Sequence, residues 1–289
     1  MKPHDGVAVI TGAGGIGLAC ARRFVDLDVI LADVTRDILE MAISCLESQN
    51  VSGIVCDVSS AESVAGLVRA AEERGPIRAL VHTAGLSGTL CSSEDVLRVN
   101  LGGAVNVLEA FGEVMAPGSA GVFIASIGGH QRFAREVDAL LTSVDPLKAI
   151  VDAGLLKLGP SAAYGVAKRG VTVQCEIRAQ EWGKRGNRLV SLSPGLIEDT
   201  LMGAAARDHG PGRLYATWSA LGRNGRSDEV ARVVKFLCSE EASFITGIDL
   251  LVDGGLIAGI QRHVDMETRL RWHACVYPAP SVRGEVPHG

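Results

Sequence analysis

Short apolar segments alternate with longer amphipathic segments along most of the chain. The short segments are rich in β-branched residues, as buried strands are, whereas apolar residues recur with helical spacing in the longer ones. The predicted strands are Val7–Thr11, Val29–Ala32, Gly53–Cys56, Ala79–His82, Val122–Ser126, Leu189–Leu192 and Ile248–Val252. The predicted helices are Ile16–Val25, Arg36–Leu46, Ala61–Ala71, Asn100–Met115, Ala163–Trp182 and Asp228–Leu237. The alternation predicts an α/β fold, a single doubly wound Rossmann-type domain with a mainly parallel seven-stranded sheet.

One internal segment departs from this alternation. Residues 130–160 separate the fifth predicted strand from the next helix and have apolar residues at helical spacing, including Val137 and Leu141. Asp145 and Pro146 then form a pair favoured at the start of a helix, because Asp can cap it and Pro suits its first turn. We therefore predict a helical insertion at 130–160.

The chain of 289 residues is long enough for one large domain or two ordinary ones, and no linker or repeat divides it. We assign residues 1–259 to one Rossmann-type catalytic domain. Residues 260–289 form a C-terminal extension that begins rich in Arg and His and ends rich in Pro and Gly. Such a segment fits a lid, an oligomer arm or a partly disordered tail.

Composition argues against several classes of protein. Charged residues or glycines interrupt every apolar stretch before the roughly 18 residues of a membrane span, and we expect no secretory signal, because the first residues lack its apolar run. Seven cysteines without paired spacing are typical of reduced thiols in the cytoplasm. No zinc-binding spacing occurs, so we expect no metal. A formal charge of −5 with dispersed basic residues disfavours a nucleic-acid partner. We expect a cytoplasmic protein with neither a nucleic-acid nor a membrane partner.

The first predicted strand leads directly into a glycine-rich turn that opens a helix. The candidate cofactor-binding residues of this turn are Gly12, Gly14, Gly15, Ile16 and Gly17. Glycines permit a tight turn and close approach of the backbone to a ligand, and a helix N-terminus offers free N–H groups to a pyrophosphate. A glycine turn can also serve only to pack a strand against a helix. Its position after the first strand of an alternating pattern favours dinucleotide binding.

Asp33 ends the second predicted strand, where its carboxylate can accept hydrogen bonds from ribose hydroxyls. The same negative charge would repel a 2′-phosphate, and the next residue is Val34 instead of a base, so NAD is favoured over NADP. Arg36 lies close enough to weaken this argument, and a carboxylate at a strand end can also be an ordinary turn residue. Asp57, after the third strand, fits a contact to adenine or a turn residue equally well.

Tyr164 and Lys168 are four positions apart in a helical segment, so both project from one helix face. A phenol has an ordinary pKa near 10, but a neighbouring ammonium and an oxidised nicotinamide would both stabilise the phenolate. The pair therefore fits a tuned acid and base. By spacing alone, a solvated helix face fits as well.

Three further positions strengthen the catalytic interpretation. Ser126 ends the fifth strand, so its hydroxyl would emerge at the carboxyl edge of the sheet, where ligands of such folds bind; it also fits a turn serine. Asn100 begins a predicted helix and fits an N-cap. Pro194 and Gly195 follow the sixth strand and make a turn toward a substrate loop, or ordinary loop punctuation.

Taken together, these motifs resemble the short-chain dehydrogenase/reductase family from Val7 to about Gly255. Further matching motifs are Ser193-Pro194-Gly195, Gly222-Arg223-Asn224-Gly225 and Val252-Asp253-Gly254-Gly255. The resemblance implies that Ser126 orients and polarises a carbonyl and that Tyr164 exchanges the proton. It also implies that Lys168 lowers the pKa of Tyr164 and holds the nicotinamide ribose, with Asn100 supporting a water-linked proton relay to Lys168. The remaining cofactor contacts that it implies are Asp57, Val58, Thr83, Ala84, Gly85, Pro194, Gly195, Ile197 and Thr200.

The chain also departs from the family pattern. The glycine turn is one residue shorter than usual between Gly12 and Gly15. Thr83 replaces the usual Asn after the fourth strand, which puts the hydrogen bonds of that Asn in doubt. The Thr expected after Pro194-Gly195 comes one position late, as Thr200, with Asp199 in its place.

The insertion separates Ser126 from Tyr164 by far more residues than is usual in the family. It resembles the extension of bacterial 3α-hydroxysteroid dehydrogenase/carbonyl reductase, which implies a bulky alicyclic or steroid-like substrate. Because helices near this point commonly form the family's dimer face, the insertion also puts the usual tetramer in question. His130, at its start, fits a pocket residue or an exposed loop residue.

These features lead to one main hypothesis and two rivals. The main hypothesis is an NAD-dependent oxidoreductase that interconverts a small-molecule secondary alcohol and its ketone, acting as a homodimer or homotetramer. A non-catalytic dinucleotide sensor or scaffold is the first rival, and retention of Ser126, Tyr164 and Lys168 argues against it. A sugar-nucleotide epimerase or dehydratase is the second, and the Val-Asp-Gly-Gly ending argues against that.

Overall fold

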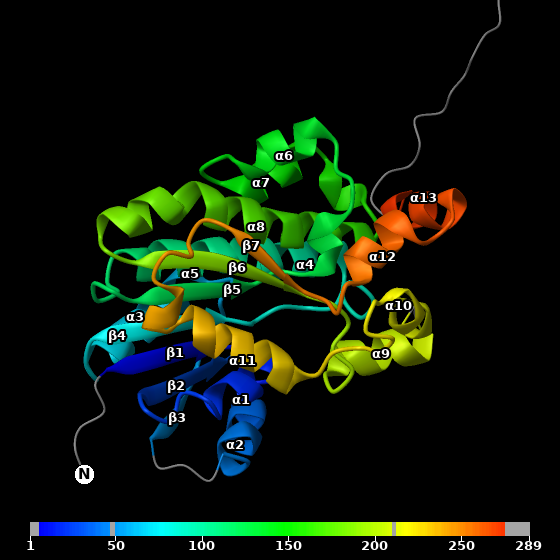
Figure 1. Ribbon diagram of the computed structural model, residues 1–289. Helices are drawn as coiled ribbons and strands as arrows, with labels where there is room; N and C mark the ends of the chain where they lie inside the picture. The colour runs from blue at the N-terminus through cyan, green and yellow to red at the C-terminus, as the bar shows by residue number, and fades with distance from the viewer. Residues whose placement is uncertain (1–5, 47–49, 210–211, 275–289) are drawn as a thin grey trace, which may run out of the picture.

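The computed structural model describes residues 6–46, 50–209 and 212–274, and within them one parallel sheet carries the fold. Its strand order is β3-β2-β1-β4-β5-β6-β7 (Figure 1). The strands are β1 Val7–Thr11, β2 Asp28–Asp33, β3 Val51–Val55, β4 Ile77–His82, β5 Ala120–Ile124, β6 Arg188–Pro194 and β7 Asp249–Val252. The predicted seven-stranded, doubly wound architecture is confirmed.

Helices connect the strands and extend beyond them, with η1 a π-helix and the other η elements short 3₁₀ helices. Before β5 they are α1 Gly15–Ala21, α2 Arg36–Ser44, α3 Ala61–Glu72, α4 Ser93–Leu97, η1 Arg98–Gly102 and α5 Gly103–Gly112. Between β5 and β6 they are η2 Ile127–His130, α6 Arg135–Leu141, α7 Pro146–Asp152, η3 Leu155–Lys157 and α8 Pro160–Lys184. After β6 they are α9 Leu201–His209, α10 Gly212–Trp218, α11 Ser227–Leu237, η4 Glu240–Ala242, α12 Leu256–Arg262 and α13 Met266–Ala274.

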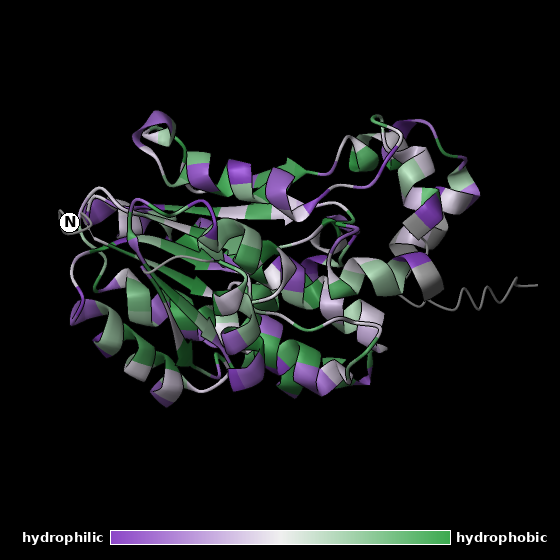
Figure 2. Ribbon diagram, turned by 90° about the horizontal axis from the view of Figure 1, so that it is seen from below, coloured by the Kyte–Doolittle hydropathy of each residue, from purple (hydrophilic) through white to green (hydrophobic). Residues whose placement is uncertain are grey.

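Two apolar layers cover the sheet, one on each face. One layer joins the strands to α1, α2 and α11 through buried residues such as Phe24, Leu39 and Val234. The other joins them to α3, α5 and α8, with Phe111 and Trp182 among its largest members. Figure 2 shows the apolar strands between these helices. A parallel sheet needs this cover on both faces because its strands are apolar on both.

The segment between η2 and α8 is helical, and it packs on the body of the protein through an apolar cluster of its own. Leu141 of α6 and Ile150 of α7 are fully buried and join α4, η1 and α8. The fit against α8 is close, because a Cβ on Gly170 would lie 3.0 Å from Leu141 Cδ2. Arg169 of α8 also bonds to Asp138 of α6 at 2.9 and 3.1 Å. The insertion is therefore packed against the helix that carries Tyr164.

Most predicted helix boundaries lie within three residues of the observed ones, and two differ by more. The helix expected to begin at Asn100 is already under way there, because α4, η1 and α5 follow one another without a break. Asn100 lies within the π-helical turn and caps nothing. The first helix ends at Ala21 instead of Val25. There the Arg23 N–H turns back to the Cys20 carbonyl at 2.8 Å, and the fully buried Phe24 enters the core.

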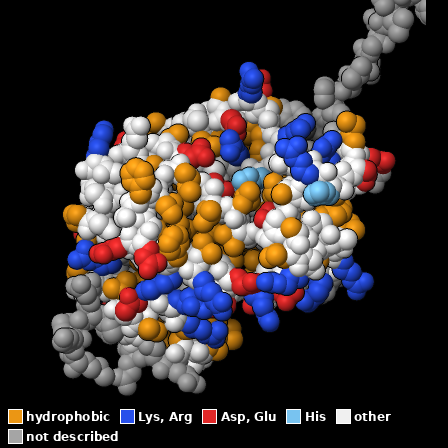
Figure 3. All heavy atoms as spheres, in the orientation of Figure 1, with side chains coloured by type: hydrophobic (Ala, Val, Ile, Leu, Met, Phe, Trp, Pro, Cys, Tyr) orange, Lys and Arg blue, Asp and Glu red, His pale blue; other side chains and the backbone are white. Residues whose placement is uncertain are grey.

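The β7 edge of the sheet carries apolar side chains that face outward. Figure 3 shows apolar side chains gathered over this side of the molecule. Leu251 of β7 is 38% exposed, and Ile248, just before the strand, is 43% exposed. Exposed apolar residues along an open strand edge suit association with another chain.

The packing of the insertion predicts a difference in stability between two of its own residues. Leu141→Ala removes a fully buried side chain and should lower the free energy of unfolding by about 2–5 kcal/mol. Val144→Ala, at a position 87% exposed, should change it by less than about 0.5 kcal/mol. Urea unfolding followed by circular dichroism measures both. Equal effects would show that the insertion does not share the core.

Candidate active site

The glycine turn lies at the carboxyl edge of the sheet, where β1 ends, and its shape depends on two glycines. Gly12 has φ of +86°, and a Cβ there would lie 2.7 Å from the Ala84 backbone nitrogen. A Cβ on Gly17 would lie 1.7 Å from the Gly12 carbonyl oxygen. Gly14, by contrast, is exposed, and a Cβ there would meet nothing within 4 Å. The backbone at Gly14 is thus open to a ligand, while Gly12 and Gly17 allow the close backbone contacts that shape the turn.

Asp33 is held directly against this turn. One of its carboxylate oxygens accepts the Ala13 N–H at 2.9 Å, and the other accepts the Thr35 N–H at 3.2 Å. The shortened glycine turn therefore still connects to the end of β2. The next residue, Val34, is 62% exposed and apolar. No basic side chain therefore lies at the position next to Asp33. The carboxylate is fixed in place, and its charge has no basic neighbour at that position.

Asp57 and Val58 follow β3 and have different surroundings. An oxygen of Asp57 accepts both the backbone N–H and the hydroxyl of Ser59, at 2.9 and 2.7 Å. The cap of α3 is Ser60, so Asp57 is a turn residue and not the cap. Val58 is 6% exposed and lies against Gly103 of α5.

Thr83 replaces the expected Asn and takes part in a connection between strand ends. Its hydroxyl donates to the Thr11 carbonyl oxygen at 2.8 Å, with the Gly12 carbonyl oxygen at 3.0 Å. Its backbone N–H also bonds to the Thr11 carbonyl at 2.9 Å. The hydroxyl of Thr83 thus makes hydrogen bonds of its own, and they tie the end of β4 to the glycine turn. Ala84 lies against Gly12 at the same place.

Asn100 and Lys168 both lie close to Gly85. A Cβ on Gly85 would lie 3.2 Å from Asn100 Oδ1 and 3.5 Å from Lys168 Nζ. Asn100 is 1% exposed, and its amide bonds to both the N–H and the carbonyl of Leu86, at 2.6 and 2.9 Å. The π-helical turn thus directs Asn100 toward the segment after β4. A π-turn at such a position is often associated with function.

Lys168 is 4% exposed and donates from Nζ to the Ile124 carbonyl oxygen at 2.8 Å. Burial lowers its pKa to about 8. The same nitrogen lies 5.9 Å from the centre of the Tyr164 ring. The ammonium is thus placed at the end of β5, next to the phenol but bonded to the backbone.

Tyr164 and Ser126 face each other across the carboxyl end of β5. Burial raises the pKa of Tyr164, and a hydrogen bond from Ser126 opposes that rise. The Ser126 oxygen also accepts the Gly128 N–H at 3.1 Å. The lowered pKa that the family resemblance implies for Tyr164 is not found in the structure, because the ammonium of Lys168 bonds to a carbonyl and not to the phenol. A bound cation would add the charge that favours phenolate.

The segment after β6 lies between the end of β7 and the glycine turn. Pro194 ends the strand, and a Cβ on Gly195 would lie 2.9 Å from Asp253 Cα. Ile197 is buried, whereas Thr200 turns toward the glycine turn, its Cγ2 2.6 Å from where a Cβ on Gly15 would be. Asp199 bonds to the N–H and hydroxyl of Ser227 at 2.8 and 3.0 Å.

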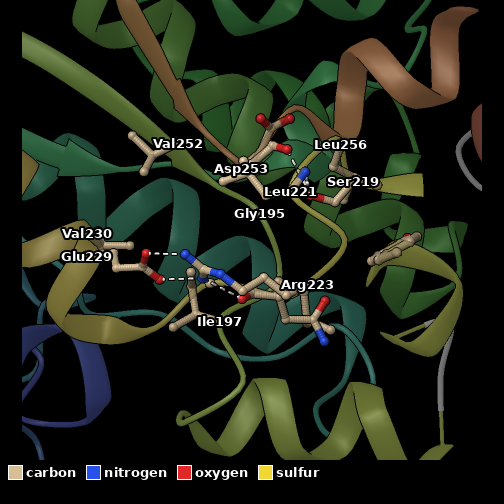
Figure 4. A pocket seen from close by; sticks show the side chains of 15 residues that line it. Gly195, Ile197, Ser219, Leu221, Arg223, Glu229, Val230, Val252, Asp253 and Leu256 are labelled. Atoms are coloured by element: carbon tan, nitrogen blue, oxygen red, sulfur yellow. Dashed lines mark hydrogen bonds and ion pairs between the residues drawn. The ribbon is translucent and has the colours of Figure 1, made fainter. Parts of the chain in front are cut away.

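Two hollows flank this segment. One of about 240 Å³ lies beside the glycine turn, and Gly15, Arg22 and Asp199 are among its lining residues. The other, of about 110 Å³, lies behind the loop that follows Gly195 (Figure 4). Figure 4 shows Arg223 directed toward Glu229, to which it bonds at 2.7 and 2.9 Å. None of Ser126, Tyr164 and Lys168 lines the second hollow, so it lies apart from these three residues.

Sequence reasoning missed two polar contacts near this edge. His82 is buried, its Nδ1 2.7 Å from the Thr11 hydroxyl, and burial together with the charge of Lys168 lowers the pKa of His82 to about 3. This imidazole is therefore neutral. His130 is partly buried and bonds to Asp249 of β7 at 2.7 Å, so it is neither an exposed loop residue nor free to turn. Neither contact has a local sequence signal.

Two negative findings hold for the part of the chain that the structure describes. There, His, Cys, Asp and Glu side chains form no group of three or more that could hold a metal ion. None of the helices in that part is both long and apolar enough to cross a membrane.

Comparison with known proteins gives consistent matches. Residues 6–137 match a family model described as short chain dehydrogenase, and residues 150–257 match one described as enoyl-(acyl carrier protein) reductase. The chain is 34% identical to short-chain dehydrogenase/reductase bsc3 of Alternaria brassicicola, covering 88% of this chain and 96% of that protein. It is 31% identical to 3-alpha-hydroxysteroid dehydrogenase/carbonyl reductase of Comamonas testosteroni, covering 78% and 91%. A solved structure of actinorhodin polyketide ketoreductase with NADPH matches with a TM-score of 0.71 at 28% identity, covering 89% and 99%.

These matches span both sides of the insertion, and they agree with the seven-stranded parallel fold. The chain therefore belongs to the short-chain dehydrogenase/reductase family.

Proposed function

We propose that this protein is an NAD-dependent oxidoreductase that reversibly transfers a hydride between a secondary alcohol or ketone and nicotinamide, with Tyr164 as acid and base. One observation supports it above the others. Ser126 and the Tyr164 ring both lie beside Gly128, and Lys168 and Asn100 both lie beside Gly85 at the same sheet edge. A proton donor, a carbonyl-orienting hydroxyl and a buried ammonium are thus within one small region.

The residues present fit a dinucleotide. The open backbone at Gly14 and the helix start beyond it suit a pyrophosphate, and the fixed carboxylate of Asp33 suits ribose hydroxyls. Further residues proposed to hold it are Gly12, Gly15, Ile16, Gly17, Asp57, Val58, Thr83, Ala84, Gly85, Pro194, Gly195, Ile197 and Thr200. Nicotinamide, when bound, supplies the carbon that accepts or gives the hydride.

The protein's own groups handle the proton and the substrate oxygen. Ser126 donates a hydrogen bond to that oxygen and holds it beside the Tyr164 hydroxyl. Tyr164 takes the proton from the alcohol or returns it to the developing alkoxide. Lys168, whose pKa burial lowers to about 8, stabilises phenolate when it turns from Ile124 toward Tyr164 and the ribose. Asn100, fixed by Leu86, continues the proton path away from Lys168.

For substrate we propose a bulky alicyclic or steroid-like alcohol. The relative from Comamonas testosteroni is named for a hydroxysteroid and for carbonyl reduction. In this chain Ile127, next to Ser126, packs with Trp272 of α13, and Tyr215 and Trp218 of α10 pack on the same cluster. An apolar, aromatic surface beside the catalytic serine favours an apolar ring over a polyol.

The non-catalytic sensor remains the second candidate function. It would need the glycine turn and Asp33 and would have no use for Ser126, Tyr164 and Lys168. A screen of secondary alcohols separates the two: hydroxysteroids, terpenoid alcohols and sugar alcohols are each offered with NAD and with NADP while NAD(P)H absorbance is recorded. Absence of turnover across the panel would favour the sensor.

We also propose that the protein works in the cytoplasm as a homo-oligomer, a dimer or a tetramer. Support comes from the apolar residues along the β7 edge, which an isolated chain would leave in water. The insertion, packed on α4 and α8, bears on whether the assembly stops at a dimer.

Replacing the proposed acid and base should separate chemistry from binding. Tyr164→Phe should lower turnover at least a hundredfold, because the proton donor is lost. NADH affinity, measured by fluorescence titration, should stay within about threefold. Ser44→Ala, which removes an exposed hydroxyl on α2, is the control and should retain turnover. A Tyr164→Phe enzyme with normal turnover would remove Tyr164 from the mechanism.

Cofactor choice should depend on the charge of Asp33. Asp33→Asn keeps an acceptor for the Ala13 N–H but loses the carboxylate, so NADH affinity should fall about tenfold while NADPH affinity rises. Dissociation constants for both cofactors measure this. An unchanged preference would show that another residue selects the cofactor.

The β7 edge should be required for self-association. Leu251→Glu places a charge on the exposed apolar edge and should shift the protein toward monomer in sedimentation velocity. Val144→Glu, on the insertion, is the control for an added charge at an exposed position and should leave the assembly intact. Unchanged assembly of Leu251→Glu would place the contact elsewhere.

A further inference from the structure

Two of the four residues in the turn after Ser126 are glycines, and Ile127, which precedes them, packs in the apolar cluster around Trp272. After Ser126, the 3₁₀ helix η2 contains Gly128 and Gly129. A Cβ on Gly128 would lie 3.4 Å from two atoms of the Tyr164 ring, and one on Gly129 would lie 3.0 Å from the Lys168 carbonyl carbon. The turn thus fits closely against α8 because it lacks side chains there. Since the Gly128 N–H bonds to the Ser126 oxygen, the serine hydroxyl follows the position of this backbone.

His130 ends the turn and supplies the anchor that the glycines lack. Its Nε2 donates to Asp249 Oδ2 at 2.7 Å, which joins the turn to β7, the edge strand. The other oxygen of Asp249 accepts the hydroxyl of Ser191 on β6 at 2.6 Å. The Asp249 side chain is only 6% exposed. The anchor is therefore a buried carboxylate, itself held by a strand of the sheet interior.

Hydrogen bonds favour an ionised Asp249. Burial raises the pKa of this carboxyl, but hydrogen bonds from His130 and Ser191 outweigh burial and lower it. Three side chains of α8 are also electrostatic neighbours of Asp249. Arg169 is positive but bonds to Asp138 of α6, Glu176 is a carboxyl group, and Cys175 is a buried thiol. His130 is thus the direct partner that links the Asp249 charge to the catalytic turn.

The contact is not needed to attach β7. Backbone hydrogen bonds already join this strand to β6, from Ser191 N–H to Ile248 and from Gly195 N–H to Val252, both at 3.0 Å. The contact between His130 and Asp249 instead restrains η2. Gln131, the residue after η2, donates from its side-chain amide to the Trp272 carbonyl oxygen at 2.9 Å. Between these two anchors the backbone of η2 has little freedom.

We propose that His130 and Asp249 are positioning residues for the catalytic serine. By holding η2 from the edge strand, they keep the Ser126 hydroxyl directed at Tyr164 and at the substrate oxygen. The geometry stands on its own, while the role in turnover rests on the proposed function.

The direct test measures the ionisation of Tyr164 without any substrate. The chain has three tyrosines, so ¹³Cζ-tyrosine NMR gives few signals, and Tyr164→Phe assigns the one of interest. Ser126→Ala should raise the pKa of Tyr164 by about half a unit to one unit, because the hydrogen bond from Ser126 is lost. His130→Leu should raise it by a similar amount. In the double variant His130→Leu/Ser126→Ala, the pKa should equal that of Ser126→Ala alone.

Further variants make the result specific. His130→Gln keeps an N–H near the Nε2 position and should restore the wild-type pKa. Glu109→Gln, which breaks the ion pair of α5 with Arg178 on α8, is the control for loss of an ion pair and should leave it unchanged. Asp249→Asn removes the carboxylate from the other side of the contact. It replaces His130→Leu in the test if urea unfolding shows that His130→Leu does not fold. A pKa unaffected by His130→Leu and Asp249→Asn, or shifts that add to that of Ser126→Ala, would overturn the proposal.

Turnover gives an independent measure with any alcohol that the panel yields. His130→Leu should lower kcat about tenfold, leave KM for NAD within twofold, and have no further effect in the Ser126→Ala background. An equal loss in both backgrounds would indicate a structural role and overturn the proposal. If no alcohol is oxidised, the proposed function fails, while the tyrosine titration still decides whether His130 positions Ser126.

Discussion

The parallel register of β1, β4 and β5 is the constraint on which the site depends. Thr11 pairs with His82, and His82 pairs with Phe123, so three strands end abreast. The glycine turn, the Thr83 segment and the Ser126 turn consequently leave the sheet side by side. Side chains then bond to carbonyl groups at these strand ends, Thr83 to Thr11 and Lys168 to Ile124. The backbone of the sheet thus positions the groups assigned to chemistry.

The sequence predicted what local patterns determine. Strand and helix alternation, the glycine turn and the four-residue spacing of Tyr164 and Lys168 are all readable within short windows. Contacts between distant positions were not readable. Nothing near His130 indicates Asp249, and nothing near Thr11 indicates His82, because tertiary packing selects each partner. The raised pKa of Tyr164 escaped prediction for a similar reason, since it depends on how deeply tertiary packing buries the phenol.

Segments from three parts of the chain meet at the turn after Ser126. The glycines of η2 lie against α8, His130 reaches the edge strand, and Ile127 and Gln131 contact the C-terminal helix that carries Trp272. The region proposed to recognise substrate is therefore in direct contact with the residue proposed to orient it. The described part of the C-terminal extension therefore lies next to the turn that carries Ser126.

The π-helical turn at Arg98–Gly102 sets which way the side chains of α5 face. Before it, Val96 and Leu97 face the cluster shared with the insertion, whereas after it Ala104, Val107 and Phe111 face the sheet. The wider turn changes the angular phase of the helix, so one continuous helix serves two different apolar surfaces. Loss of a single residue there would rotate every later side chain by about 100° and turn the sheet-facing stripe of α5 away from its strands. The number of residues in this turn is therefore as constrained as their identity.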